Sequence, residues 1–169
     1  MESRDLLLTA FDTVEEVVRG ALDGIDPALL TERLDPDANT IAWLVWHLTR
    51  VQDDHVSEVA GTEQAYTAEG WADRFGLPFE PGAIGYGFSS ADVAATVVTD
   101  PQLLVDHHAE VHRRTAAFLR TLSAGDLDRV VDERWDPPVT LGVRLLSVIG
   151  DDLQHAGQAA IVRGVLERR

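Results

Sequence analysis

The chain has 169 residues, 45% of them hydrophobic, and its 29 acidic and 14 basic residues give a formal net charge of −15. This composition excludes a disordered chain, because it supplies enough apolar surface for a core, and it excludes a nucleic-acid binder, because phosphates require a basic surface. The sequence contains no cysteine, and therefore no disulfide, no thiolate metal ligand and no cysteine nucleophile.

The first helical pattern extends from about residue 3 to residue 22. Apolar side chains recur there every three or four positions, the spacing that places them on one face of an α-helix. This stripe consists of Leu7, Phe11, Val14, Val18 and Leu22. Gly24 and Pro27 follow, so we expect the helix to end at this point.

The second pattern covers about residues 40–60 and stops at Gly61. Its stripe consists of Ile41, Leu44, Leu48 and Val51. Asn39 or Thr40 is suited to cap this helix, because a short side-chain oxygen accepts a hydrogen bond from an unpaired backbone N–H.

Residues 61–99 are the least regular part of the chain, since glycine and proline recur throughout them. Short helices are expected at about residues 68–75 and 91–98, the second one beginning after Ser90. We interpret the remainder as a long connection that crosses the bundle or covers one of its ends.

The last two patterns cover about residues 101–122 and 141–166. Pro101 suits a first helical turn, where its missing N–H costs nothing. The stripe of the third helix consists of Leu104, His108, Val111, Thr115, Phe118 and Leu122. The fourth helix has two apolar sides, which predicts that it is buried between neighbours. One side holds Gly142, Leu145, Leu146, Ile149, Leu153 and Ala156, and the other holds Val148, Ala159, Val162 and Leu166.

Together these patterns predict an all-α fold, an antiparallel four-helix bundle with a long crossover between the second and third helices and no β-sheet core. The chain length favours one domain over residues 1–169. Apolar runs are far shorter than the roughly 20 residues of a membrane span, and Met1 to Asp5 lack the pattern of a secretory signal. The negative charge disfavours anionic membrane surfaces. We therefore expect a soluble, cytoplasmic protein with no membrane partner.

Asp151 and His155 are the first candidates for chemistry, because residues four apart are adjacent on a helix surface. Such a pair can converge on one metal ion, with a third ligand from another helix. His47 is the best candidate for that ligand, and Trp43 and Trp46 beside it are placed to line a pocket. The alternative stays open that the pair forms a plain hydrogen bond and that His47 is an ordinary buried histidine.

A second histidine pair, His108 and His112, has the same spacing. His108 is expected to face inward and His112 to lie at the edge of the stripe, and we favour a partly exposed face over a metal site. His107 adds an imidazole that points elsewhere, because adjacent helical residues do not face each other. His55 lies two turns after His47, either near the same cavity or towards the helix end.

Other classes of site find little support in the sequence. There is no Gly-rich phosphate loop and no G-x-S-x-G turn. Ser89 and Ser90 are interpreted as helix-start residues. The acidic pairs at residues 15–16 and 53–54 are expected to be solvated.

Trp46-His47-Leu48 in the second helix and the run Asp151 to Gln158 in the last helix resemble the DinB-like superfamily, and within it the mycothiol-transferase-like group of actinobacteria. The likeness covers essentially the whole chain in helix order. It implies a four-helix bundle that holds a divalent metal by three side chains at one end. By position, His47, Asp151 and His155 match these three ligands.

Asp151 departs from the three-histidine set that is usual in this superfamily. It is similar to the maleylpyruvate-isomerase-like branch, where a glutamate takes this place. A carboxylate binds zinc at about the same distance as imidazole, but it lowers the charge of the site and shifts its preference toward harder metals such as Mn²⁺. The implied cofactor is thus a divalent metal, Zn²⁺, Ni²⁺ or Mn²⁺.

The resemblance also implies a reaction, because several members of the superfamily are thiol-dependent S-transferases or isomerases. A low-molecular-weight thiol such as mycothiol binds the open metal position, loses its proton and attacks an electrophile. Trp43, Trp46 and Trp71 are expected to shape the substrate cavity. Arg144, on the Asp151 side of its helix, is expected to pair with a carboxylate of the thiol or to form a plain salt bridge.

Three functions stay open at this point. The first is a metal-dependent S-transferase with a small thiol and an electrophilic substrate. The second is a non-catalytic bundle that binds a small molecule or a partner, and the third is a metal hydrolase that activates bound water. A homodimer is compatible with each of them.

Overall fold

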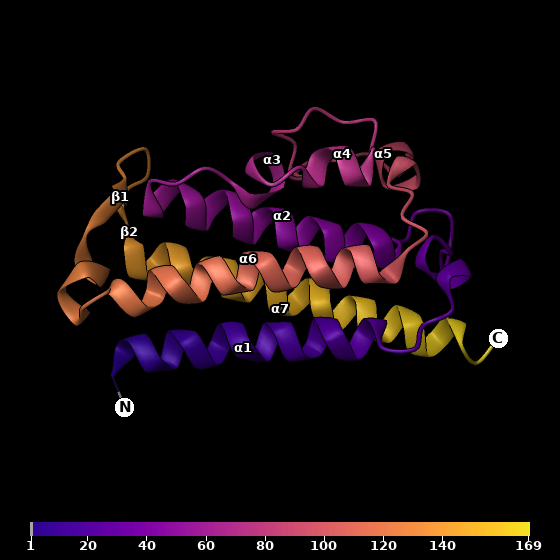
Figure 1. Cartoon of the computed structure of the whole chain (residues 1–169), viewed down its shortest axis with the longest axis horizontal. Coiled ribbons are helices and arrows are strands. Elements are labelled where there is room, and N and C mark those ends of the chain that lie inside the picture. The colour runs from indigo at the N-terminus through magenta and orange to yellow at the C-terminus, as the bar shows by residue number, and fades with distance from the viewer. Residues whose placement is uncertain (1) are drawn as a thin grey trace.

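Four long helices run along a common axis in the computed structural model, which describes residues 2–169 (Figure 1). They are α1 (Ser3–Leu22), α2 (Ile41–Ala60), α6 (Pro101–Thr121) and α7 (Leu141–Leu166). Each boundary lies within one residue of the boundary predicted from apolar spacing. The prediction of an all-α bundle is therefore confirmed.

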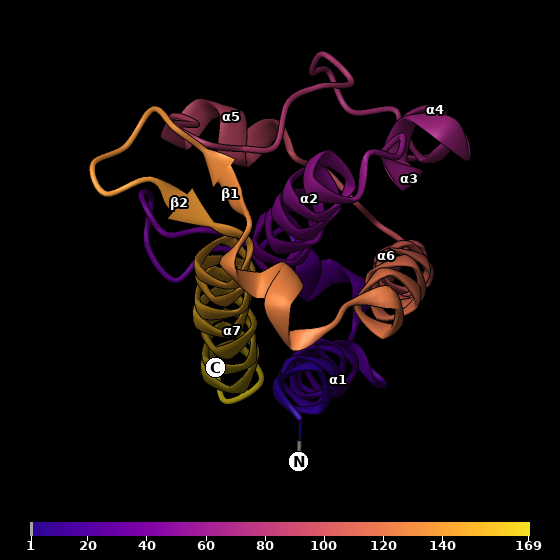
Figure 2. The ribbon, with the colours of Figure 1, turned by 90° about the vertical axis from the view of Figure 1, so that its left-hand side faces the viewer.

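The four helices surround a core of two apolar clusters, with α1 and α2 on opposite corners (Figure 2). Helix α7 packs between α1 and α2 on one side, and α6 packs between them on the other. In chain direction α1 and α7 run one way, while α2 and α6 run the other way (Figure 1). Because α2 and α6 are parallel, the chain must return along the whole bundle between them, which explains the long crossover.

Side-chain and glycine caps fix the ends of the helices that later carry the candidate site. The Thr40 hydroxyl accepts a hydrogen bond of 3.1 Å from the Trp43 N–H, so of the two predicted caps it is Thr40 that begins α2. Thr140 caps α7 in the same way. Gly61, with a φ of 69°, ends α2 in the left-handed conformation that glycine adopts at little cost.

The crossover holds three short helices, α3 (Ala65–Ala68), α4 (Trp71–Phe75) and α5 (Ser90–Ala95), which lie over α2 (Figures 1 and 2). The single helix predicted over residues 68–75 is two helices, because Gly70 has a φ of 72° and interrupts the turn. The helix predicted at 91–98 is α5, which ends three residues earlier than predicted.

Asp53 corrects the expectation that residues 53–54 are a solvated acidic pair. Its side chain is buried, and its two carboxylate oxygens accept hydrogen bonds of 2.9 and 2.8 Å from the N–H groups of Ala65 and Tyr66. The carboxylate thus binds the first N–H groups of α3, where the helix has no backbone partners for them. Asp54 is half-buried, closer to the expectation.

A small antiparallel ribbon closes one end of the bundle between α6 and α7. It consists of β1 (Val130–Asp132) and β2 (Val139–Thr140), and follows the short helix η2 (Ala124–Asp128). A similar short helix, η1 (Pro27–Leu30), follows α1. Apolar spacing did not predict the ribbon because its strands are too short to show alternation, but the core is helical as expected.

Helix α7 is less buried than its two apolar sides predict. Leu145 and Ile149 are buried, whereas Leu146 is 65% exposed and Leu153 is 37% exposed. The reason is that α7 contacts α1 and α2 but, within residues 2–169, has no third long helix on its outer side (Figure 2). No helix among residues 2–169 is both long enough and apolar enough to cross a membrane.

Replacing Asp53 by alanine tests how strongly the crossover is tied to α2. We expect Asp53→Ala to lower the free energy of unfolding by about 3–5 kcal/mol, because it leaves the Arg50 guanidinium buried without its charge partner. The matched change Asp54→Ala, at the half-buried neighbour, should cost only about 0–1 kcal/mol. Urea denaturation measures both, and equal losses would contradict the assignment.

Candidate metal centre

Three of the predicted site residues come together in the structure. His47 lies on α2, and Asp151 and His155 lie on α7, with one possible ligand atom of each residue within 4.8 Å of the others. The rings of His47 and His155 are 4.9 Å apart between centroids. The packing of α2 against α7 thus brings side chains together that are more than 100 positions apart in the sequence.

The donor atoms are spaced almost as a small divalent ion requires. Ligands at 2.0–2.2 Å from one tetrahedral ion are about 3.4 Å from each other. His155 Nε2 lies 3.6 Å from Asp151 Oδ1, and the full set within 4.8 Å needs only a small contraction. Two imidazole nitrogens and one carboxylate oxygen form a donor set that suits Zn²⁺, Ni²⁺ or Mn²⁺. The residues therefore fit the metal that the resemblance implies.

Hydrogen bonds on the far side of each imidazole orient both rings. His47 Nδ1 lies 2.5 Å from the carbonyl oxygen of Ile84, which can only accept, so this nitrogen carries the proton. His155 Nδ1 lies 3.1 Å from the side-chain oxygen of Gln158. Both contacts are made by Nδ1, so Nε2 is the ring nitrogen that each histidine has available for a metal. Metal-binding histidines are usually held by such a second hydrogen bond.

Burial favours the metal-binding form of the site. His47 is 4% exposed, and desolvation lowers its pKa below the ordinary value, which keeps the imidazole neutral. Trp43 stacks on the His47 ring at 4.5 Å between centroids and meets the His155 ring edge-on at 6.0 Å. Asp151 Oδ2 is buried without a hydrogen-bond partner among the described residues. A buried carboxylate oxygen without a partner is costly unless something binds it.

The three side chains open into a cavity of about 340 Å³ between α2, α7 and the crossover. Its lining consists of Asn39, Trp43, His47, Gly85, Tyr86, Gly87, Phe88, Val93, Asp151 and His155. Trp43 lines the cavity as expected, whereas Trp46 lies behind it. The Trp46 indole packs against Phe79 and Phe88 at 5.9 and 6.0 Å, so it supports the cavity without lining it.

The crossover loop supplies part of the site that the sequence analysis missed. Besides the Ile84 carbonyl, it places Gly85 directly against His47, with a φ of 92°. A Cβ atom at Gly85 would lie 2.7 Å from His47 Nδ1 and 3.2 Å from the Trp46 ring. Only glycine fits here. The alternation of Gly85, Tyr86, Gly87 and Phe88 is the one local signal of this contact, but glycine recurrence by itself indicates only a loop.

Arg50 holds this loop in place from α2. Its side chain is fully buried, and its guanidinium donates to the carbonyls of Pro81 at 3.2 Å and Ala83 at 3.3 Å. It also pairs with Asp53 at 3.2 Å and lies over the Tyr66 ring, 4.1 Å from its centroid. The loop that orients His47 is thus fixed one turn further along the same helix.

Arg144 and His55 lie in a different cavity, of about 400 Å³. The Arg144 guanidinium is 2.5 Å from Glu58 and 3.3 Å from Asp132. Of the two roles considered for Arg144, the salt bridge is the one it adopts, and it does not line the candidate metal cavity. His55 lies beside it, 3.4 Å from its guanidinium, towards the end of α2.

The second histidine pair does not form a shared site. His108 is buried and its Nδ1 lies 3.1 Å from the Thr49 hydroxyl, whereas His112 Nε2 points to Asp12 at 3.0 Å. Within residues 2–169, only His47, Asp151 and His155 form a group of three metal-ligand side chains. This geometry agrees with the prediction that His108 and His112 do not form a metal site. His108 is, however, more deeply buried than the predicted partly exposed face implies.

His107 connects the crossover to α6. It is fully buried among the rings of Tyr66, Trp71 and Phe75, at centroid distances of 5.4, 5.1 and 5.3 Å. Trp71 therefore packs on a buried histidine. Contrary to the expectation, it does not line the candidate cavity.

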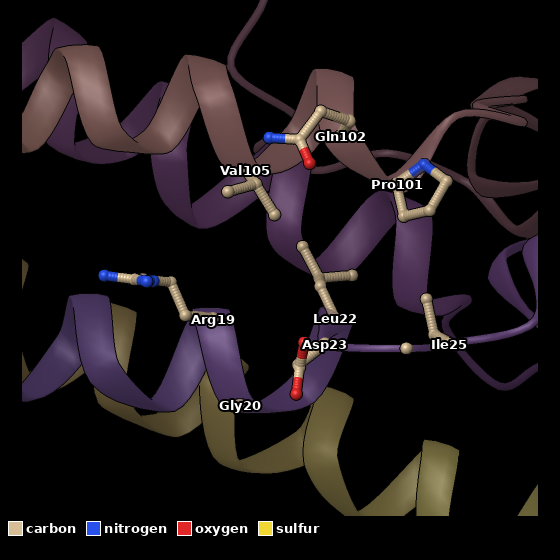
Figure 3. A pocket seen from close by; sticks show the side chains of 9 residues that line it. Arg19, Gly20, Leu22, Asp23, Ile25, Pro101, Gln102 and Val105 are labelled. Carbon is tan, nitrogen blue, oxygen red and sulfur yellow. The ribbon is translucent and has the colours of Figure 1, made fainter.

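A larger cavity, of about 620 Å³, lies between the end of α1 and the start of α6 (Figure 3). Leu22, Ile25 and Val105 contribute apolar side chains to it, and Arg19 and Gln102 contribute polar ones (Figure 3). None of its lining residues belongs to the group of metal-ligand side chains. Cavity size alone therefore does not locate the chemistry in this protein.

Comparison with known proteins places the chain in a family. A family model described as mycothiol-S-transferase matches residues 6–168. The chain belongs to this family. The mycothiol S-transferases lie within the DinB-like superfamily, so the resemblance seen in the sequence is confirmed.

A solved structure supports the same fold. A crystal structure described as the conserved protein of locus from Enterococcus faecalis superposes with a TM-score of 0.93 and 27% sequence identity, over 100% of this chain and 99% of that chain. No curated protein matches the chain. The mycothiol S-transferase family and the all-α DinB-like fold are thus established, while the chemistry of the individual side chains has to be argued from their arrangement.

Buried His108 predicts a specific dependence of stability on pH. Desolvation lowers its pKa from 6.5 to about 3 in the folded state. The unfolded chain therefore binds one more proton between these values, and stability is lost as the pH falls through this window, by up to about 1.4 kcal/mol per pH unit. We expect His108→Gln to show a shallower loss of stability between pH 6 and about 4 in urea denaturation. An unchanged slope would contradict the burial of a neutral imidazole.

Proposed function

We propose that this protein is a divalent-metal-dependent S-transferase that uses a low-molecular-weight thiol such as mycothiol. One observation carries the proposal. His47, Asp151 and His155 place three ligand atoms within 4.8 Å at a cavity, in a chain that belongs to the mycothiol S-transferase family. The family gives the thiol chemistry, and the cluster gives a place where it can occur.

The three side chains would hold the ion and leave room for a substrate. Three protein ligands with an open fourth position are the arrangement of catalytic metal sites, whereas structural zinc sites are closed by four. The open side faces the cavity, where Tyr86 is 83% exposed at the rim. Because Asp151 brings a negative charge, we expect Mn²⁺ to compete with Zn²⁺ and Ni²⁺ more successfully than at a three-histidine site.

When bound, the ion supplies a position at which an exogenous thiol ionises near neutral pH. The chain itself contains no cysteine, so the thiol has to come from a second molecule. The sulfur forms a bond to carbon of an electrophile R–X, the C–X bond breaks, X⁻ departs, and the thiol proton goes to solvent. Trp43 and Phe88 give this reaction an apolar part of the cavity wall.

Of the three side chains predicted to contact the thiol, we retain one. Trp43 is the proposed contact, because it lines the cavity beside His47. Trp46 does not line the cavity, but it packs against Phe88, which does. Arg144 is occupied by Glu58 and Asp132 in another cavity, so we do not assign it to the thiol.

Metal binding can be measured directly. We expect one equivalent of Zn²⁺, Ni²⁺ or Mn²⁺ per chain by calorimetry, and a loss of at least 100-fold in affinity in His155→Ala, because two ligands remain. The matched control is His112→Ala. His112 follows His108 by four residues on α6, as His155 follows Asp151 on α7, but it contacts Asp12. Equal affinities of the two variants would contradict the assignment of the ligands.

The transfer reaction needs its own assay. The metal-loaded protein is offered mycothiol with monobromobimane, and thioether formation is followed by fluorescence. We expect conjugation above the uncatalysed rate with at least one of the three metals, and a rate near background for His47→Ala. Metal binding without conjugation for every metal would favour the non-catalytic bundle or, if ester or amide substrates are cleaved, the hydrolase.

Two glycines of the crossover loop offer a matched test of how His47 is positioned. Both have positive φ, 92° at Gly85 and 71° at Gly87, but a Cβ at Gly87 would contact nothing within 4 Å. We expect Gly85→Ala to weaken metal binding by about 10–100-fold, the effect of disturbing the surroundings of a ligand. Gly87→Ala carries similar backbone strain and should leave the affinity within a few-fold. Equal effects would mean that strain, and not contact with His47, is responsible.

A further inference from the structure

The outer side of α7 has no charged residue that is free to face solvent between Val143 and Gly164. The charged side chains of this stretch are engaged elsewhere: Arg144 and Asp152 are buried, Asp151 lies at the candidate metal centre, and Arg163 binds the carbonyls at the end of α1. A solvated helix face in a chain of net charge −15 would ordinarily carry charges.

Large apolar side chains occupy this uncharged side instead. Leu146 is 65% exposed, Leu153 is 37% exposed and Ile161 is 66% exposed. Within the described chain no long helix covers them, as the end view shows (Figure 2). An exposed apolar stripe of this length is typical of a surface that binds another protein.

Helix α1 continues the surface. Gly20 lies next to α7, because Arg163 Nη1 donates to its carbonyl at 3.2 Å. Thr13 and Leu6 precede Gly20 at intervals of seven residues, so they share its side of the helix. All three are exposed and uncharged. The uncharged surface thus spans two neighbouring helices.

Glycines form a second row on α7 beside the larger residues. Leu146, Leu153 and Ala160 are seven residues apart, and so are Gly150, Gly157 and Gly164. A Cβ at Gly150 or Gly157 would contact nothing within 4 Å, and at Gly164 it would meet only the end of the Arg168 side chain. The glycine row is therefore a shallow channel along the helix, open to an approaching side chain at Gly150 and Gly157 and bordered at Gly164 by the flexible Arg168 side chain.

We propose that this side of α7 is the interface of a homodimer, in which α7 packs antiparallel against α7 of a second copy about a two-fold axis near residue 155. In this register Leu153 fits against the partner's Gly157, and Leu146 fits against the partner's Gly164. Each copy supplies both the projecting row and the channel, as an interface between identical surfaces requires. Glycine at every seventh position lets the two helices approach closely.

Charge and area favour a second copy as the occupant. Two chains of net charge −15 repel each other over most of their surface, and the side of α7 that lacks free charges is where that repulsion is least. The stretch of α7 from residue 146 to residue 164 is about 28 Å long, and with α1 the surface is about 20 Å wide. Two such faces bury roughly 1,000 Å², the size at which a specific interface begins.

The dimer leaves the candidate metal centre accessible. Asp151 and His155 face α2 and the crossover loop, on the side of α7 turned away from the Leu146–Leu153 row. The interface therefore does not depend on the metal or on the proposed transfer reaction, and it can be tested on protein without added metal.

Sedimentation velocity of the full chain, at about 5–100 μM in 150 mM salt, tests the proposal. We expect a species of twice the 18.5 kDa chain mass. Leu153→Glu should weaken the association at least 10-fold, because it places two carboxylates at the centre of the interface. The matched control Val97→Glu adds a carboxylate at an apolar residue that is 53% exposed elsewhere, and it should leave the mass unchanged.

Gly157→Leu tests the register without adding charge. The monomer has room for the side chain, and leucine favours the helix more than glycine does, so circular dichroism should show an intact fold. We expect the dimer to dissociate at least 10-fold more readily, because the channel opposite Leu153 is filled. A monomer at every concentration, or a dimer that survives both Leu153→Glu and Gly157→Leu, would overturn the proposal.

Discussion

The buried guanidinium of Arg50 joins the regular and the irregular halves of this molecule. It lies within α2, yet its partners are the carbonyls of Pro81 and Ala83, the carboxylate of Asp53 and the ring of Tyr66. A fully buried arginine is stable only when its donors are paired. Apart from Asp53, which lies on α2 itself, these partners belong to the crossover, and in return the crossover is held against the helix. The Ile84 carbonyl that orients His47 directly follows this anchored segment.

The long helices, and the pairing of Asp151 with His155, could be predicted from the sequence because both depend on the spacing of residues a few positions apart. Apolar residues at intervals of three or four define the helices, and the interval of four between Asp151 and His155 makes them neighbours on α7. That His47 joins them follows from the pairing of α2 with α7, which the resemblance to the DinB-like superfamily implied and the structure shows.

The crossover could not be predicted in the same way, because its structure depends on contacts between residues far apart in the sequence. Nothing local distinguishes Asp53, which caps α3, from its half-buried neighbour Asp54. Arg144 similarly lies on the side of α7 that suits a contact with a thiol, but its guanidinium pairs instead with Asp132 of β1. A two-residue strand such as β2 is equally invisible to periodicity. Each of these features is decided by tertiary packing and not by local pattern.

The candidate centre is divided between two kinds of structure. Its ligand atoms come from α2 and α7, which are fixed by the core, whereas the opposite wall comes from the loop around Gly85, Tyr86 and Phe88. Loops on the surface accept sequence change far more readily than packed helices do. Exchanges at the exposed Tyr86 can therefore reshape the space above the ligands while the ligands stay in place. In evolutionary terms, this division would let a proposed S-transferase of this kind change the electrophile it accepts without changing the three side chains proposed to hold the metal.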